Sequence, residues 1–433
     1  MRKIRVNGFV EMKNNIWIVN QYAMPPDREV RVRNHKMAEH LICDGYNVLI
    51  IGGSALHNMG ENLIPGNGPG FVLNEYGVLK FAHIKVGDYS GNGIDRIVSM
   101  AQFQFRLRKY AKKIAKESGI IPDYVIVDCA PLPFYMGYRV SRLFNAVYIK
   151  EVRDLWPASL VEYGFLKEGS LLARFLYRLE RKQYEKADRI VFSMQGGADY
   201  IIDKGWDLDS GGNVDLEKVH YINNGIDLKE FDTNKDIVPK VYTQYFSAEC
   251  VNFLYAGSIR HANQLDTFIS VFDRVVNEGY KIRLIIVGDG DQREMLEKKY
   301  QCNPNILFTG PVDKKCIPSI LEQADVCVLC VRKTRLGEYG ISYNKLFDYF
   351  ASGKPILNLF KTKNDLIDHA NAGVSLDQQS YELIRDAIQY FSDMSSVDRE
   401  SMGARGRKLA ESFDFKILTN KLISILEDFK DNV

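Results

Sequence analysis

Short runs rich in Val and Ile recur along the whole chain, and each is separated from the next by a stretch with helical character. In the first half these runs cover residues 16–20, 47–51, 124–128, 146–151, 189–193 and 219–222. In the second half they cover residues 252–256, 283–287, 306–309, 326–331 and 355–359. Runs of this length are typical of buried parallel strands, and their alternation with helices is typical of α/β folds. The pattern therefore predicts two βαβ-type sheets in tandem.

Helices are expected between these runs. Residues 29–43 lead into Gly45 and residues 100–117 end at Gly119, and glycine at such a position is a usual stop signal. Residues 265–277, 292–300 and 415–429 are further candidates, and the polar stretch 232–249, which contains Pro239, is the best linker. We therefore expect domains at residues 1–240 and 241–412, followed by a final helical segment at residues 413–433.

Composition narrows the class of protein. The 433 residues are enough for two domains, and a content of 46% apolar and 26% charged residues is that of a globular protein. A net charge of +2 argues against a dedicated nucleic-acid binder. The seven cysteines are scattered and odd in number, which predicts no disulfide framework. The first residues lack an apolar signal core and no run approaches the roughly 18 residues of a membrane span, so a cytoplasmic location is expected.

The most specific motif spans residues 340–355 (Gly-Ile-Ser-Tyr-Asn-Lys-Leu-Phe-Asp-Tyr-Phe-Ala-Ser-Gly-Lys-Pro) and is typical of a loop, a helix and a glycine stop. The start of a helix suits a phosphate group because it presents free N–H groups and the positive end of the dipole. Lys345 adds a charge, and Asp348 follows three residues later on the same side, where a carboxylate can accept both hydroxyls of a ribose. An ordinary capped helix with a Lys–Asp pair is the alternative.

Two glycine-containing loops follow strands of the second half, where open α/β sheets bind ligands. One spans residues 255–260 and ends in Arg260, which can clamp a diphosphate with two hydrogen bonds. The other spans residues 287–291 and contains Asp289 and Asp291. We interpret this pair of acids as solvated residues on a glycine turn and expect no metal site.

In the first half, charged residues follow a strand at residues 150–157 (Lys-Glu-Val-Arg-Asp-Leu-Trp-Pro). Glu151, Arg153 and Asp154 stand next to Trp156 at the strand end, which indicates a functional site. A loop held by ion pairs is the alternative.

Together these segments resemble the retaining family-4 glycosyltransferases, especially those that build bacterial surface polysaccharides. The resemblance covers nearly the whole chain and rests on the order and spacing of its landmarks. They are residues 89–96 (Tyr-Ser-Gly-Asn-Gly-Ile-Asp-Arg), 151–157, 224–227 (Asn-Gly-Ile-Asp), 253–257, 287–290, 308–310 (Phe-Thr-Gly) and 344–355.

The resemblance implies a GT-B fold, in which two Rossmann-like domains face each other across a cleft. It implies that the C-terminal domain holds the nucleotide sugar, the N-terminal domain holds the acceptor, and the last helix crosses back to the first domain. The implied donor-binding residues are Gly257, Arg260, Gly288, Gly340, Ile341, Ser342, Asn344, Lys345 and Asp348. The implied catalytic residues are Glu151, Arg153 and Asp154. Transfer with retention of configuration is implied, with the nucleotide sugar as co-substrate, no cofactor and no metal.

Three departures from the family's pattern involve four positions. The first of two usual donor-loop glutamates is Gly340 here, with Glu338 nearby. An Arg and a Lys that commonly follow the first strand of the C-terminal domain are Ser258 and Asn263. A His that is common in the family is replaced here by Arg153. This arginine cannot act as a base near neutral pH because its pKa exceeds about 12.

The expected activity is transfer of a sugar from a nucleotide sugar, a UDP-sugar, to a lipid-linked saccharide, as in the biosynthesis of O-antigen or capsule. A second GT-B enzyme class, such as a nucleotide-sugar epimerase, and an inactive sugar-binding homologue remain as alternatives. A dinucleotide-binding oxidoreductase requires Gly-x-Gly-x-x-Gly after the first strand, and that position lacks glycine.

Residues 96–116 contain seven Lys or Arg and no acid, interspersed with apolar residues. This composition is typical of a helix at an anionic lipid surface, and it predicts peripheral association with the inner face of the cytoplasmic membrane. The alternative is that the apolar face packs on the sheet while the charges keep the protein in solution.

Overall fold

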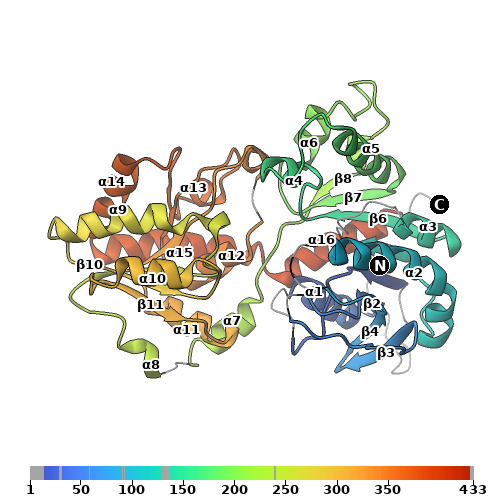
Figure 1. Ribbon diagram of the computed structural model, residues 1–433, viewed down its shortest axis with the longest axis horizontal. Helices are drawn as coiled ribbons and strands as arrows, with labels where there is room; N and C mark the ends of the chain where they lie inside the picture. The colour runs from blue at the N-terminus through green and yellow to red at the C-terminus, as the bar shows by residue number, and fades with distance from the viewer. Residues whose placement is uncertain are drawn as a thin grey trace. The chain divides into compact units, whose positions relative to one another are not determined.

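The computed structural model describes residues 14–28, 32–57, 59–89, 91, 93–128, 136–237, 240–340 and 342–429. The chain forms two compact α/β units (Figure 1). The N-terminal unit comprises residues 1–223 together with 418–433, and the C-terminal unit comprises residues 224–417.

The N-terminal unit is built on an eight-stranded sheet in the order β3-β4-β2-β1-β5-β6-β7-β8. Its strands are β1 (Asn15–Val19), β2 (Asn47–Gly53), β3 (Phe71–Tyr76), β4 (Leu79–Ile84), β5 (Tyr124–Val127), β6 (Val147–Val152), β7 (Arg189–Phe192) and β8 (Val219–Tyr221). Only β3 and β4 pair antiparallel; every other neighbouring pair in this sheet is parallel. The described helices of the unit are α1 (Arg33–Cys43), α2 (Ile94–Ser118), α3 (Met136–Leu143), α4 (Ala158–Glu162), α5 (Leu171–Lys186), α6 (Gly197–Asp203), a 3-10 turn at Leu216–Lys218 and residues 418–427 of α16 (Phe415–Glu427).

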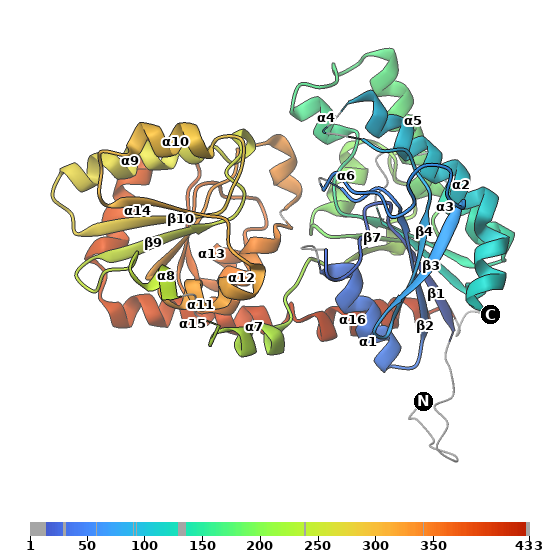
Figure 2. The ribbon, with the colours of Figure 1, turned by 60° about the horizontal axis from the view of Figure 1, so that its bottom comes forward.

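Helices cover both faces of this sheet (Figure 2). On one face Ile18 and Ile126 lie with Met37 of α1 and Leu422 of α16 around a small cavity. On the other face Trp17 packs edge-on against Phe144, which follows α3, with ring centroids 5.3 Å apart. Tyr148 and Phe192 pack in the same way against aromatic residues of α3 and α5. Apolar packing on both faces explains why most strands of this sheet are continuous apolar runs.

The C-terminal unit is built on a six-stranded, fully parallel sheet in the order β11-β10-β9-β12-β13-β14. Its strands are β9 (Val251–Ala256), β10 (Ile282–Val287), β11 (Ile306–Gly310), β12 (Val326–Leu329), β13 (Ile356–Asn358) and β14 (Gly373–Ser375). The described helices are α7 (Leu228–Asn234), α8 (Lys240–Thr243), α9 (Leu265–Asn277), α10 (Arg293–Tyr300), α11 (Ile317–Glu322), α12 (Asn344–Ser352), α13 (Leu366–Ala370), α14 (Tyr381–Asp393) and α15 (Ser396–Glu411), with 3-10 turns at His261–Asn263, Lys314–Cys316 and Arg335–Tyr339.

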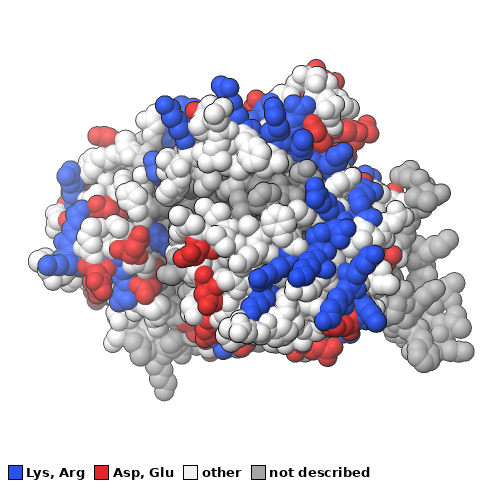
Figure 3. All heavy atoms as spheres, turned by 45° about the vertical axis from the view of Figure 1, so that its right-hand side comes forward, with Lys and Arg blue, Asp and Glu red and all other residues white. Residues whose placement is uncertain are grey.

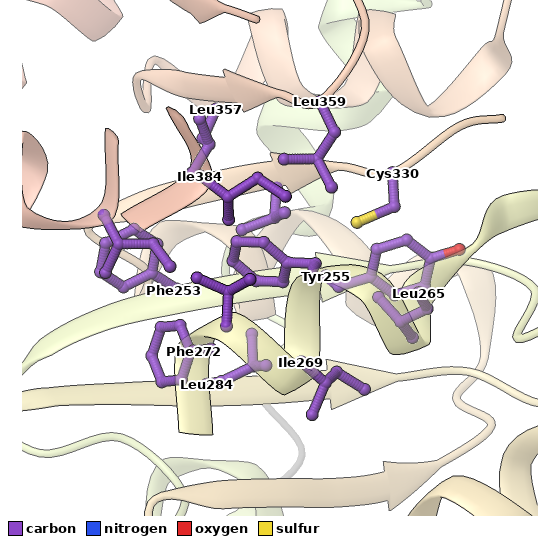
Figure 4. Close-up of a cluster of buried hydrophobic side chains, with 14 of the residues drawn as sticks. Phe253, Tyr255, Leu265, Ile269, Phe272, Leu284, Cys330, Leu357, Leu359 and Ile384 are labelled. Carbon is purple, nitrogen blue, oxygen red and sulfur yellow. The ribbon is translucent and has the colours of Figure 1, made fainter. Parts of the chain in front are cut away.

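The core of the C-terminal unit is aromatic at its centre (Figure 4). Phe253 of β9 meets Phe272 of α9 edge-on, with ring centroids 5.4 Å apart. Leu284 of β10, Leu357 of β13 and Ile384 of α14 complete this layer. On the opposite side of the sheet α12 packs against α15, which fixes the helix that carries the most specific sequence motif.

The structure confirms the predicted alternation of strands and helices and corrects several details. Helix α2 begins at Ile94, six residues before the expected start. The stretch 232–249, expected to be a linker, contains the end of α7 and all of α8 within the C-terminal unit. Residues 29–31 of the first expected helix lie outside the described residues. Among the described helices, none is long and apolar enough to cross a membrane.

Close packing of α15 on the end of α12 requires a glycine, and this generates a stability prediction. A Cβ atom on Gly403 would stand 1.8 Å from the carbonyl oxygen of Gly353. Backbone cannot yield as a side chain does, so Gly403→Ala should lower the free energy of unfolding by about 3 kcal/mol, the upper end of ordinary overpacking costs. Urea unfolding followed by circular dichroism measures this.

Gly93→Ala is the matched control for this substitution, because a Cβ at Gly93 meets nothing within 4 Å and its φ is −76°. Equal unfolding midpoints for the two variants would show that α15 moves away from α12 without cost.

Candidate functional site

The loops that follow β9, β10 and β11 meet at the carboxyl edge of the C-terminal sheet. The backbone N–H of Gly257 donates to Val287 O (2.9 Å), and that of Gly288 donates to Gly310 O (2.9 Å). The N–H of Ile259 donates to Asp289 O (2.8 Å). These bonds lie beyond the strands and hold the two predicted loops side by side.

Glycine is required where these loops touch. Gly288 has φ 141°, and a Cβ there would lie 1.9 Å from the carbonyl oxygen of Gly257. Gly257 itself has φ 154°. Any side chain at Gly288 would separate the loops, so this glycine sets how closely backbone can approach at the edge.

Helix α12 is fixed to the ends of two strands by one buried phenol. Tyr349 Oη accepts a hydrogen bond from Ala256 N (2.9 Å) and lies 3.2 Å from the carbonyl oxygens of Ala256 and Val328. The helix begins after Tyr343, which provides no side-chain cap, and ends at Gly353 with φ 69°. Its first turn therefore leaves backbone N–H groups without a side-chain acceptor from the capping residue, as an anion site needs.

The structure brings Lys345 to the first glycine loop. Its ammonium lies 4.5 Å from the ring centroid of Tyr255 and donates to Tyr255 Oη (3.2 Å). A Cβ on Gly257 would stand 3.2 Å from Lys345 Nζ, so the charge lies directly beside this glycine. Burial lowers the pKa of Lys345 to about 8, because the half-buried ammonium is desolvated.

Asp348 lies one turn further along the same helix. Its carboxylate is half-buried and has no hydrogen bond or ion pair to any described residue. Burial raises the pKa of Asp348 to about 6, against the opposing effect of Lys314. Lys345 and Asp348 do not form the ion pair that is expected for an ordinary helix. A carboxylate that has lost water without gaining a protein partner is suited to accept hydrogen bonds from a ligand.

The other residues predicted to bind the nucleotide-sugar donor are less closely tied to this edge of the sheet. Arg260 and Asn344 are exposed and form no side-chain hydrogen bond or ion pair with described residues. Ser342 O accepts a hydrogen bond from Asn224 Nδ2 (2.8 Å). Ile341 lies outside the described residues. Gly340 has φ 101° and ψ 175°, a conformation that is open essentially only to glycine.

The backbone of Gly340 gives a physical reason for the departure from the family's glutamate, since any side chain there would be strained. Glu338, the nearby acid, is exposed within Arg335–Tyr339. Ser258 and Asn263, which together form the second departure, are linked to each other. Asn263 Nδ2 donates to Ser258 Oγ (3.1 Å) and to Tyr255 Oη (3.1 Å). The residues found where the family has cations thus support the tyrosine that contacts Lys345.

The described residues contain no group of three or more His, Cys, Asp or Glu that could hold a metal ion. Asp289 instead lies 3.7 Å from Arg293 in an ion pair on the surface. Cys327 and Cys330 are fully buried in and just after β12, as packing residues are.

In the N-terminal unit, Glu151 is buried in an ion pair. Its Oε1 lies 2.8 Å from Arg33 Nε and 2.6 Å from Arg33 Nη2. Arg33 also donates to the carbonyl oxygens of Ile222 (3.1 Å) and Asn223. Glu151 is 6% exposed and Arg33 is 2% exposed, so this carboxylate is occupied inside the unit.

Arg153 belongs to a second buried network at the carboxyl ends of three strands. Its guanidinium donates to Asp128 Oδ2 (3.0 Å), which also accepts from Asn20 Nδ2 (2.7 Å). Burial alone would lower the pKa of Arg153, but Asp128 and Glu151 raise it above its ordinary value, so the side chain stays charged. Asp154 is exposed.

Sequence reasoning missed Arg33, Asp128 and Asn20. Asn20 and Asp128 each stand directly after a buried apolar strand, β1 and β5, which is a signal that the sequence contains. Parallel strands end at one edge, so polar residues that follow neighbouring strands meet there. Arg33 had no such signal, because its partner is 118 positions away in the chain.

Comparison with known proteins supports a glycosyltransferase domain in the C-terminal unit. Residues 250–393 match the family of glycosyl transferases group 1. A putative teichuronic acid biosynthesis glycosyltransferase, TuaH of Bacillus subtilis strain 168, is 24% identical over 213 residues, which cover 48% of this chain and 49% of that protein. A probable glycosyltransferase, WbjE of Pseudomonas aeruginosa, is 23% identical over 287 residues, 64% of this chain and 65% of that protein. The matches thus span half to two thirds of these relatives.

Solved structures show that the fold is GT-B. Sucrose-phosphate synthase from Thermosynechococcus elongatus superposes with a TM-score of 0.71 at 14% identity, covering 97% of this chain and 100% of that one. HepE from Anabaena, solved in complex with UDP-glucose, superposes with a TM-score of 0.63 at 12% identity, covering 96% and 100%. At these identities the likeness establishes the architecture alone.

The burial of Glu151 generates a prediction that separates a structural role from a catalytic one. Glu151→Ala leaves Arg33 charged and without its carboxylate, and breaking a buried ion pair in this way costs about 3–5 kcal/mol. We expect the free energy of unfolding to fall by about that amount, measured by urea denaturation. Asp209→Ala, at an exposed acid of the same unit, should change stability by less than about 0.5 kcal/mol. Wild-type stability for Glu151→Ala, with catalysis lost, would assign Glu151 to the reaction instead.

Proposed function

We propose that this protein is a glycosyltransferase that moves a sugar from a UDP-sugar to a lipid-linked saccharide acceptor, with retention of configuration, during the biosynthesis of a surface polysaccharide such as O-antigen or capsule. The observation that carries the proposal is the placement of Lys345 and Asp348 at the carboxyl edge of the C-terminal sheet. A desolvated cation beside Gly257 and a carboxylate without a protein partner lie on one helix, next to that helix's N-terminus.

The two charges suit the two polar parts of a nucleoside diphosphate. Lys345 and the N–H groups at the start of α12 would bind the diphosphate, whose negative charge grows as the bond to the sugar breaks. Arg260 is exposed on the neighbouring loop and would add a second cation. Asp348, a turn away, would accept hydrogen bonds from the ribose hydroxyls. In this proposal these groups stabilise the leaving diphosphate without a metal ion.

The acceptor side is proposed to lie in the N-terminal unit. Asp154 is exposed just after β6, and it follows the ion-paired residues Glu151 and Arg153 in the chain. We propose that Asp154 orients a sugar hydroxyl, while Arg153, which stays protonated, supplies positive potential and no base. The relative TuaH, described as a putative teichuronic acid biosynthesis glycosyltransferase, supports a polysaccharide product.

A lipid-linked acceptor requires the protein to reach a membrane, and helix α2 supports this part of the proposal. Its buried side, with Met100, Phe103 and Leu107, packs within the unit as in the alternative interpretation, while Ile94, Ile97, Val98 and Phe105 remain exposed. Exposed cations nevertheless remain on the other side, at Arg108, Lys109, Lys112 and Lys116. Lys and Arg side chains gather in bands on one face of the molecule (Figure 3). Each cation near an anionic surface contributes about 1 kcal/mol.

Release of UDP from UDP-glucose by the purified protein, with EDTA present, tests the proposed reaction class. Lys345→Met should reduce turnover on the order of a hundredfold, as loss of one oxyanion-stabilising group does. Lys298→Met, at an exposed cation on α10, is the matched control and should be neutral. Epimerised nucleotide sugar without UDP release would indicate an epimerase, and binding without any conversion would indicate an inactive homologue.

The pKa values of Lys345 and Asp348 generate a separate prediction about binding. A diphosphate favours the charged ammonium, so affinity for UDP-glucose should fall as the pH rises through about 8, where free Lys345 loses its proton. Below about 6 Asp348 is protonated and loses its capacity to accept two hydroxyl hydrogen bonds, so affinity should fall there too. Titration calorimetry should give maximal affinity between these values, with proton uptake on binding near pH 8.

In Lys345→Met the proton uptake near pH 8 and the alkaline loss of affinity should both disappear. In Asp348→Asn only the acid limb should disappear. A flat profile for the wild-type protein would remove these two side chains from the nucleotide site.

A further inference from the structure

A second feature of the N-terminal unit bears on the membrane. The α4–α5 loop and the first turns of α5 expose large apolar side chains: Phe165 is 80% exposed, Leu171 85%, Leu172 57% and Phe175 52%. We call these four residues the apolar tip. Single exposed apolar residues are normal, but four within eleven positions at one end of a helix need an explanation.

The apolar tip is rigidly built, because a satellite core lies directly beneath it. Leu166, Ala173 and Leu176 are buried together against Trp156 and Leu160. The N–H groups of Phe165 and Leu166 both donate to Leu160 O, at 2.9 and 3.1 Å. Ser170 caps α5 by accepting from Ala173 N (3.2 Å). The side chains of the apolar tip are therefore exposed on a local structure that is itself well packed.

Exposed charges around the apolar tip are mainly positive. Lys167, Arg174, Arg178 and Lys182 are exposed and form no ion pair with described residues, whereas Glu168 is the one exposed acid within residues 163–182. A second copy of the chain is disfavoured as the occupant, because a twofold contact would bring these cations against each other. An anionic lipid surface offers both acyl chains for the apolar residues and negative headgroups for the cations.

The order of residues along α5 matches the layers of such a surface. Leu171, Phe175, Arg178 and Lys182 follow one another at helical spacing on one exposed stripe. With a rise of about 1.5 Å per residue, Arg178 and Lys182 lie about 10 and 16 Å beyond Leu171. Apolar side chains that enter the interface by about 5–10 Å would leave the arginine at headgroup level.

We propose that the apolar tip is the membrane-insertion element of this protein and that the exposed cations of α5 select anionic lipid. This inference rests on the proposed lipid-linked acceptor and assigns the docking to a segment other than α2. The chain runs from β6 through Asp154 directly into α4 and the tip. Insertion of the tip therefore brings the proposed acceptor side of the unit to the bilayer that holds the acceptor.

Flotation of the full-length protein with vesicles of phosphatidylcholine and phosphatidylglycerol tests the proposal, with phosphatidylcholine vesicles as the comparison. The triple variant Phe165→Ser, Leu171→Ser, Phe175→Ser should partition at least about tenfold more weakly than the wild-type protein. The matched control, Met295→Ser, Tyr390→Ser, Val397→Ser, alters exposed apolar residues of the other unit and should bind as the wild type does. The variant Arg174→Gln, Arg178→Gln, Lys182→Gln should lose the preference for anionic vesicles.

Wild-type partition by the tip variant, or no vesicle binding by the wild-type protein, would overturn the proposal. A change from dimer to monomer in the tip variant without vesicles would also overturn it, in favour of self-association. Neutralising Arg108, Lys109, Lys112 and Lys116 tests α2 separately.

Stabilisation by UDP, measured as a thermal shift, should be the same in the wild type and the tip variant. Loss of that shift in both would reject the proposed donor site while leaving the docking result intact.

Discussion

The geometry of the proposed donor site depends on a single buried hydroxyl. Tyr349 reaches from the middle of α12 to the backbone at the ends of β9 and β12, and a buried phenol without such partners would cost free energy. This one group fixes both the distance and the rotation of α12 relative to the sheet. Because Lys345 and Asp348 lie within one turn of Tyr349, their positions follow from that contact. The chemistry proposed for the edge therefore depends on a core hydrogen bond that touches no ligand.

Charge is used differently in the two units. In the N-terminal unit two charges at the end of β6 are paired internally, Glu151 with Arg33 and Arg153 with Asp128. Buried pairs of this kind are costly to break and hold strand ends in register. In the C-terminal unit the charges on α12 lack ionic partners among the described residues. The buried charges at the end of β6 are thus paired within the protein, whereas Lys345 and Asp348 are proposed to be completed by a ligand.

The sequence allowed the order of elements and helix α12 to be predicted, because buried parallel strands and a helix that ends at a glycine have strong local patterns. It did not allow β3 and β4 to be predicted, since β3 lies at the sheet edge with alternating exposure, nor β14, whose three residues form no period. The partner of Glu151 also escaped prediction. Whether a carboxylate at a strand end faces a ligand or a buried arginine depends on packing between segments far apart in the chain. This packing cannot be inferred from the local sequence.

Ser258 and Asn263, at positions where the resembled glycosyltransferases commonly have cations, belong to one arrangement around Lys345. Two neighbouring cations would repel its ammonium and lower its pKa further than burial alone does. In this chain those positions are neutral, and Asn263 instead supports Tyr255, on which the ammonium rests. Lys345 is therefore desolvated but not repelled, so it can still take up a proton near neutral pH. An anion that binds beside it would relieve the cost of desolvation, and binding would be coupled to protonation of this one side chain. The proposed donor site, with Lys345 half-buried and Arg260 exposed on the neighbouring loop, would consequently depend more on Lys345 than a site with further cations beside it would.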